Sequence, residues 1–141
     1  GNTLLHRAAV AGNVDVATTL VDVGANKEAR NEDGDTPLHR ATTFGKAEVA
    51  AMLVEAGADK EAKAKEGCTA LHLAATAGTL PLARVLVDAG ADKEARTEDG
   101  RRPLHMAASL GRSAVAEVLV DAGANKEAKN EDGRTPLHVA V

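Results

Sequence analysis

The chain has 141 residues, and its composition excludes several classes of protein. The formal net charge is -4, hydrophobic residues make up 44% and charged residues 27%, which is ordinary for a globular chain. No apolar run is long enough to cross a bilayer. The negative net charge and the 1% of aromatic residues do not provide the basic, stacking surface that nucleic acids require. We therefore expect neither membrane insertion nor nucleic-acid binding.

A four-residue pattern returns along the chain at a constant step of 33 residues. It begins at positions 3, 36, 69, 102 and 135 and reads Thr-Pro-Leu-His in its fullest form. All 13 glycines fall on three columns of the same register. A fixed period of this length predicts stacked copies of one small unit in place of a single core. We place the copies, within one domain spanning 1–141, at about 1–30, 31–63, 64–96, 97–129 and a truncated fifth at 130–141.

Each copy is expected to contain two short helices, and the second copy shows the pattern in full. Thr36 suits a helix N-cap and a proline follows it, so a first helix is predicted over 37–44, ending at Gly45. A second amphipathic helix is predicted over 47–55. A polar, extended arm follows over 58–63 and leads into a tight turn. The unit is therefore turn, helix, turn, helix and arm.

Helices this short are marginal alone in water, so each must bury its apolar face against the next copy. Two leucine columns are expected to form a continuous buried spine, and an alanine column is expected to let the helices approach closely. These columns are Leu5, Leu38, Leu71, Leu104 and Leu137; Leu20, Leu53, Leu86 and Leu119; and Ala8, Ala41, Ala74, Ala107 and Ala140.

The histidines occupy one column, at His6, His39, His72, His105 and His138. Equivalent positions in packed neighbouring helices lie about 10 Å apart, whereas Zn–N bonds are about 2 Å long. We therefore expect no metal site and assign these residues a structural role, in which each imidazole sits at a helix start and bonds the backbone of a neighbouring loop. No histidine then remains as a general base.

Cys68 follows a turn glycine, and we expect it to be exposed with no base beside it. The sequence therefore predicts neither an enzyme nor a cofactor. Because a lone cysteine cannot form an internal disulfide, we also expect an intracellular protein, cytoplasmic or nuclear.

The pattern Asp-Gly-x-Thr-Pro-Leu-His-x-Ala, then Gly, then Leu-Val-x-x-Gly-Ala-Asp, resembles the ankyrin repeat. The resemblance covers the whole chain, with departures at Arg102, which replaces the usual Thr, and at Leu4 and Ala70, which replace the Pro. It implies an all-α ankyrin-repeat solenoid of stacked helix-turn-helix pairs with β-turn or hairpin arms. It also implies a non-catalytic scaffold that binds a protein partner through its concave groove and turn tips.

We expect partner contacts at charged or large apolar residues of the arms, the turns and the inner helix ends, where the copies differ or carry rows of like charge. The alternative is that the arm charges are solvated and serve solubility. Few residues are of the types that dominate tight interfaces, which argues against very high affinity. The expected partner-binding residues are Arg30, Asp35, Phe44, Lys63, Lys65, Arg96, Arg101, Leu110, Lys129 and Arg134.

Two alternatives remain open. The first is an engineered or structural repeat scaffold with no physiological ligand, because the Lys-Glu-Ala linker recurs unchanged in each full copy. The second is weak head-to-tail self-association, because Val139 and Val141 would have no second helix to cover them.

Overall fold

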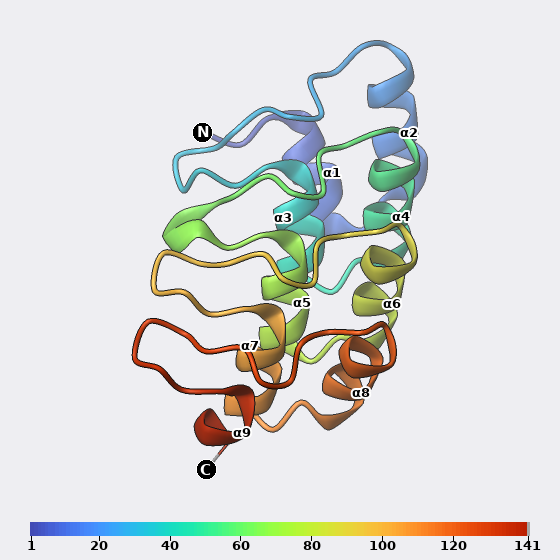
Figure 1. Ribbon diagram of the computed structural model, residues 1–141. Coiled ribbons are helices and arrows are strands. Elements are labelled where there is room, and N and C mark those ends of the chain that lie inside the picture. Colours follow the sequence, from blue (N-terminus) through green and yellow to red (C-terminus); the bar gives the residue numbers. More distant parts are fainter. Residues whose placement is uncertain (141) are drawn as a thin grey trace.

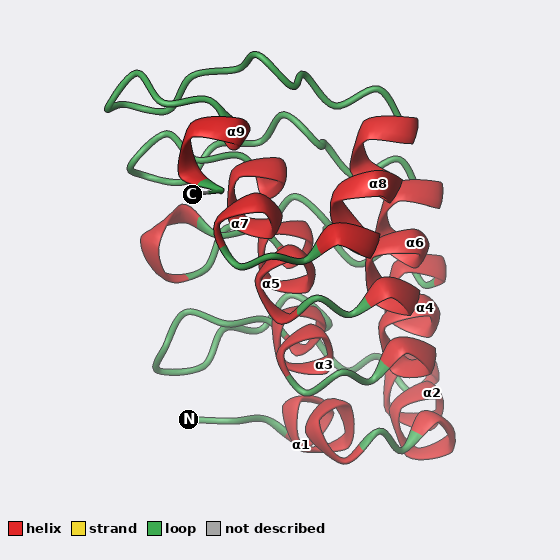
Figure 2. Ribbon diagram, turned by 90° about the horizontal axis from the view of Figure 1, so that it is seen from below, coloured by secondary structure: helices red, strands yellow, loops and turns green. Residues whose placement is uncertain are grey.

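Two layers of short helices run side by side along the chain in the computed structural model, which describes residues 1–140 (Figures 1 and 2). Val141 lies outside the described residues. The first layer consists of α1 (Leu4–Ala11), α3 (Pro37–Thr43), α5 (Ala70–Ala77), α7 (Pro103–Ser109) and α9 (Pro136–Val139). The second layer consists of α2 (Val14–Asp22), α4 (Ala47–Glu55), α6 (Leu80–Asp88) and α8 (Ser113–Asp121). Residues 1–140 contain no strand, so the fold is an all-helical solenoid.

The start of each first-layer helix is fixed by local chemistry. At α3, the Thr36 hydroxyl accepts a hydrogen bond from the His39 backbone N–H at 3.4 Å, and His39 Nδ1 accepts one from the Thr36 backbone N–H at 3.2 Å. This reciprocal capping box satisfies donors that a helix start leaves free. The same pair of bonds caps α1 at Thr3 and α9 at Thr135.

The leucine spine is confirmed in the middle of the stack. Leu38 and Leu71 are each 1% exposed, and Leu53, Leu86 and Leu119 are 0% exposed. Helices of one layer pack on the equivalent helices of the neighbouring copies, and this packing removes their apolar faces from water.

The spine prediction is wrong for Leu137 in the last copy and for Leu20 in the first, although Leu5 in the first copy is buried as predicted. Leu137 is 78% exposed, Ala140 is exposed and Leu20 is only partly buried. Within the described residues, α9 has no second-layer helix after it and α2 has no second-layer helix before it. The side chains are the same as in the middle, but no neighbour covers them.

Long arms project from one side of the two layers, one arm between each pair of consecutive copies (Figure 1). The arm turn after the first copy is closed by two backbone bonds, from Gly34 N–H to the Asn31 carbonyl and from Asn31 N–H to the Asp35 carbonyl, each 3.0 Å long. The Asn31 side-chain oxygen also accepts bonds from the backbone N–H groups of Asp33 and Asp35. The turn is therefore held by a side chain as well as by the backbone.

The arm that follows the second copy has a different turn. Ala64 stands where Asn31, Thr97 and Asn130 supply a side-chain oxygen, so that acceptor is missing. The turn winds into a short 3-10 helix, Lys65–Gly67. Within it, Glu66 has a φ of 61°, the single positive φ among the non-glycine residues of 1–140. Because a side chain disfavours the left-handed region, this turn is more strained than the others.

Candidate partner-binding surface

The arms and the adjoining first-layer helices form one flank of the molecule, and the predicted partner-binding residues lie along it. The arm residues Arg30, Lys63, Arg96 and Lys129 are all exposed. Two of them also connect neighbouring arms. Arg30 Nη1 donates to the Lys63 carbonyl at 2.7 Å, and Lys63 Nζ donates to the Arg96 carbonyl at 3.0 Å. A partner that bound these two side chains would have to share donors already used within the stack.

A glutamate column has a role that the sequence analysis missed. Oε1 of Glu28 accepts a hydrogen bond from the Asp59 backbone N–H at 2.9 Å. In the same way, Glu61 accepts a hydrogen bond from the Asp92 N–H and Glu94 accepts one from the Asn125 N–H, each at 2.8 Å. Carboxylate bonds of this type are stronger than bonds between neutral groups. The recurring Lys-Glu-Ala linker, which favoured an engineered origin, therefore also has a structural reason.

Asp35 and Phe44 are brought together by a residue that the sequence analysis did not select. Arg40 Nη1 lies 3.4 Å from Asp35 Oδ2, and the Arg40 guanidinium carbon lies 4.8 Å from the centre of the Phe44 ring. Both geometries are attractive for a guanidinium. Phe44 is nevertheless 46% exposed, so one face of its ring remains available to a partner.

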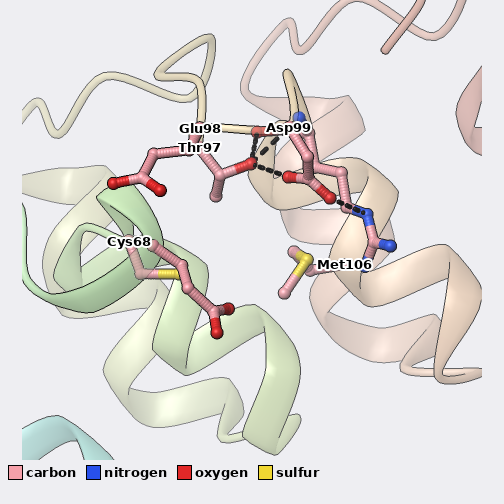
Figure 3. A pocket seen from close by; sticks show the side chains of 7 residues that line it. Cys68, Thr97, Glu98, Asp99 and Met106 are labelled. Atoms are coloured by element: carbon pink, nitrogen blue, oxygen red, sulfur yellow. Dashed lines mark hydrogen bonds and ion pairs between the residues drawn. The ribbon is translucent and has the colours of Figure 1, made fainter. Parts of the chain in front are cut away.

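A hollow of about 220 Å³ lies between the arm of residues 64–68 and the next arm along the chain. Cys68 and Met106 face each other across it, and Thr97 and Asp99 lie at its rim (Figure 3). Glu66, Glu98 and Arg101 complete the lining. We call this the acidic hollow, because three carboxylates and one guanidinium surround it.

Cys68 is half-buried in this hollow, which corrects the expectation that it is exposed. Burial raises the pKa of the Cys68 thiol, and the negative charges of Glu66, Asp99 and Glu98 raise it further. The thiol is therefore protonated at neutral pH and is a poor nucleophile. This environment is the opposite of the one that a catalytic cysteine requires.

A second hollow of about 200 Å³ lies between the last two arms. Arg101 and Arg134 line it together with His105, Ser109, Asn130 and Asp132. We call it the basic hollow, because two guanidinium groups face one carboxylate. Arg101 Nε pairs with Asp99 Oδ2 at 2.8 Å, and Arg134 Nη2 donates to the His138 carbonyl at 3.0 Å. The structure thus gathers two of the predicted residues at one place.

The other predicted residues do not share a hollow with them. Lys65 is exposed on the 3-10 turn, and Leu110 is 46% exposed at the end of α7. The predicted partner-binding residues are therefore spread along the flank, and Arg101 and Arg134 line one hollow together.

Three of the histidines bridge from a first-layer helix to the next arm. Nε2 of His6 lies 2.9 Å from the Asp35 carbonyl, His72 lies 3.1 Å from that of Arg101, and His105 lies 3.0 Å from that of Arg134. Nδ1 of each ring accepts a backbone N–H, which assigns the proton to Nε2. The imidazoles therefore join copies that are adjacent in the stack.

The expectation that every histidine makes such a bridge is wrong for His138, and the bridge is weaker at His39. Burial lowers the pKa of His39 and the backbone of Cys68, its equivalent acceptor, acts against that shift, so the imidazole lies beside this backbone although Nε2 forms no hydrogen bond of good geometry within the described residues. His138 is exposed and makes no bridge within residues 1–140. The arm beside His39 is the one with the altered turn.

Residues 1–140 offer neither a metal site nor a membrane-spanning helix. No group of three or more His, Cys, Asp or Glu side chains in this part of the chain could hold a metal ion. None of its helices is both long and apolar enough to cross a membrane.

Comparison with known families agrees with the fold. A family model described as ankyrin repeats (3 copies) matches residues 1–64, 60–130 and 97–141. The chain belongs to the ankyrin repeat family. Ankyrin repeats are generally protein–protein interaction modules, and proteins of this family are typically non-catalytic. A search of curated proteins finds no match to the chain.

Proposed function

We propose that this chain is an interaction scaffold that binds a protein partner through the flank formed by its arms and first-layer helix ends, without catalysis. The observation that carries the proposal is a contrast between columns. Leucine and histidine recur at the positions that hold the stack together. The column after the turn glycine reads Asn2, Asp35, Cys68, Arg101 and Arg134. This column lies on the flank, and its change of charge along the stack is what a surface with a specific partner would use.

The recognition would be of the rigid-body kind. The arms are joined to one another by hydrogen bonds that Arg30 and Lys63 donate and by hydrogen bonds that the glutamate column accepts. A surface that is already ordered loses little conformational entropy on binding. We therefore expect the backbone of the flank to change little when a partner binds. The free Cys68 favours an intracellular setting for that partner.

The test compares one substitution on the flank with the same substitution on the second layer. Affinity capture followed by mass spectrometry identifies candidate partners of the wild-type chain, and each candidate is then titrated as a purified protein. Arg101→Glu and Phe44→Ala are expected to weaken binding, whereas Arg84→Glu, on the exposed side of α6, is the matched control. Circular dichroism verifies that each variant is folded. Equal effects of Arg84→Glu and Arg101→Glu, or no reproducible partner, would favour a scaffold without a ligand.

A second function, weak head-to-tail self-association, is favoured by the surface of the first copy. Val16 is 46% exposed, whereas its equivalents Val49, Leu82 and Val115 are 0–1% exposed against the preceding copy. Leu4, at 65% exposed, adds to the same face. Light scattering over a range of concentrations tests the idea, and Val16→Asp should abolish any association. A monomer at all concentrations would count against it.

A further inference from the structure

We propose that the acidic and basic hollows together specify the partner: an extended segment that inserts a basic side chain into the acidic hollow and an acidic side chain, three residues away, into the basic hollow. This inference rests on the proposed function and adds the chemistry of the ligand. The two hollows lie in consecutive gaps between arms, and Arg101 lines both of them.

The acidic hollow has unused negative charge. Asp99 is engaged, because its carboxylate accepts the Thr97 hydroxyl and pairs with Arg101. Glu66 and Glu98 are exposed and form no ion pair within residues 1–140. A backbone bond of 3.0 Å from the Glu98 N–H to the Glu66 carbonyl joins the two arms that carry them. Two free carboxylates are thereby held on adjacent arms around one opening.

The lining of this hollow matches an amphipathic cation in particular. Cys68 and Met106 supply an apolar surface between the carboxylates (Figure 3). Lysine and arginine side chains place their methylene stems on such a surface and their charge at its edge. Burial and the negative charges of Glu66, Asp99 and Glu98 raise the pKa of the Cys68 thiol, so the sulfur stays uncharged and apolar beside a bound cation.

The basic hollow has the complementary property. Arg101 uses Nε for Asp99, and Arg134 uses Nη2 for the His138 carbonyl, so each guanidinium keeps further N–H donors. Asp132 also lines the hollow and offsets part of the positive charge. Two guanidinium groups with free donors suit a carboxylate, which can accept two hydrogen bonds in parallel.

The spacing of the copies sets the spacing of the two ligand charges. Packed helices lie about 8–10 Å apart, so consecutive gaps between arms are separated by about the same distance. A polyproline II segment has three residues per turn and rises about 3.1 Å per residue, so side chains three positions apart lie on one face about 9 Å apart. In a β-strand, side chains three positions apart point to opposite faces. The favoured ligand is therefore a polyproline II segment with opposite charges three residues apart.

The probes are short synthetic proline-rich peptides that differ only in charge pattern. Two contain Lys-Pro-Pro-Glu or Glu-Pro-Pro-Lys, since the hollows do not fix the chain direction. Like-charge controls contain Lys-Pro-Pro-Lys or Glu-Pro-Pro-Glu, and a spacing control contains Lys-Pro-Glu. Heteronuclear NMR titrations at low salt give dissociation constants and show whether the amides of Glu98, Arg101 and Arg134 shift.

At least one mixed-charge peptide is expected to bind roughly three- to tenfold more tightly than every control. Glu66→Gln with Glu98→Gln should remove the preference for lysine, and Arg134→Gln should remove the preference for glutamate. Arg84→Gln and Glu117→Gln, on exposed second-layer positions, should change neither. These conservative changes at exposed residues do not disturb the leucine spine.

Equal binding of the mixed and like-charge peptides would overturn the inference, as would a mixed-charge preference that survives these hollow variants. The result is separable from the test of the proposed function. If a captured protein partner depends on Arg101 and Phe44 while the peptides show no charge pattern, the scaffold role stands and the ligand chemistry is wrong. If the peptides bind as expected but no protein partner is captured, the ligand chemistry stands and the scaffold role lacks support.

Discussion

The middle of the stack and its two ends have nearly the same sequence but different structures. Leu71 in α5 is 1% exposed, and Leu137, the same residue in the same column of α9, is 78% exposed. Val49 in α4 is 0% exposed, whereas Val16 in α2 is 46% exposed. Burial in this chain is therefore set by the neighbouring copy, and the residue type alone does not determine it. The stability of a linear array depends in the same way on contacts between neighbours.

The largest difference is expected from removing one leucine at each place. Leu71→Ala should lower the free energy of unfolding by roughly 2–5 kcal/mol, because it leaves a cavity between buried helices. Leu137→Ala should change it by less than about 0.5 kcal/mol, because the side chain already lies in water. Urea denaturation followed by circular dichroism measures both. Equal losses would show that the middle and the end do not differ as described.

The second-largest effect is expected from acidification. It should lower the stability of the middle of the stack, because several buried imidazoles there respond together. Burial lowers the pKa of His39, His72 and His105 below the ordinary value of 6.5. The unfolded chain then takes up protons before the folded one does. The stability that these groups contribute is fully present above about pH 6.5 and is lost as the pH falls toward their folded pKa values.

Melting temperatures recorded between about pH 7.5 and about pH 5 test this expectation. The melting temperature should fall as the pH falls through this range. His72→Gln removes one of the three groups, so its curve should be flatter than that of the wild type. A melting temperature that rises on acidification would contradict the prediction.

A smaller effect is expected at the start of α7, where Arg102 takes the place of the capping threonine. The arginine side chain has no acceptor for the helix N–H groups, and its Nη1 is buried without a partner in the described residues. Arg102→Thr should stabilise the chain by roughly 0.5–1 kcal/mol, after allowance for the lost ion pair with Glu94. Thr36→Ala, which removes the capping hydroxyl at α3, should lower the free energy of unfolding by about 1 kcal/mol. Chemical denaturation gives the free energy of unfolding of both variants. A loss of stability in Arg102→Thr would refute the capping explanation.

The smallest effect is expected in the altered arm. Ala64→Asn restores the side-chain oxygen that Asn31 supplies in the equivalent turn, and it should stabilise the chain by about 0.5 kcal/mol. Hydrogen exchange should slow at the backbone amides of 66–68. The matched control, Asn31→Ala, should have the opposite effect on its own turn. Unchanged exchange in Ala64→Asn would show that the missing oxygen is not the cause of the altered turn.

The sequence predicts the helices well because their boundaries depend on adjacent residues. The second helix predicted over 47–55 coincides with α4, and the first helix predicted over 37–44 differs from α3 by its last residue. Capping threonines, prolines and left-handed glycines act within one turn of the backbone. Such signals are readable without knowledge of the rest of the fold.

The contacts between arms could not be predicted in the same way. The half-burial of Cys68, the weakened bridge at His39 and the hydrogen bond that Glu28 accepts from the Asp59 N–H all depend on a segment about one copy away. The arrangement of the two hollows could not be predicted from the sequence either. Arg101 and Arg134 are recognisable from their column, but their meeting at one hollow beside Glu66 and Glu98 requires the arms to be placed in space.

The glutamate column has a consequence for how arrays of this kind change length. Each carboxylate of Glu28, Glu61 and Glu94 binds a main-chain N–H of the following arm, and every residue type except proline supplies that donor. The side chains at 59, 92 and 125 take no part in this bond, because each accepts a backbone N–H two residues later in its own turn. Duplication or deletion of one complete 33-residue block would recreate the same junction at the new boundary, so such a gene can lengthen or shorten in whole units while its product stays foldable.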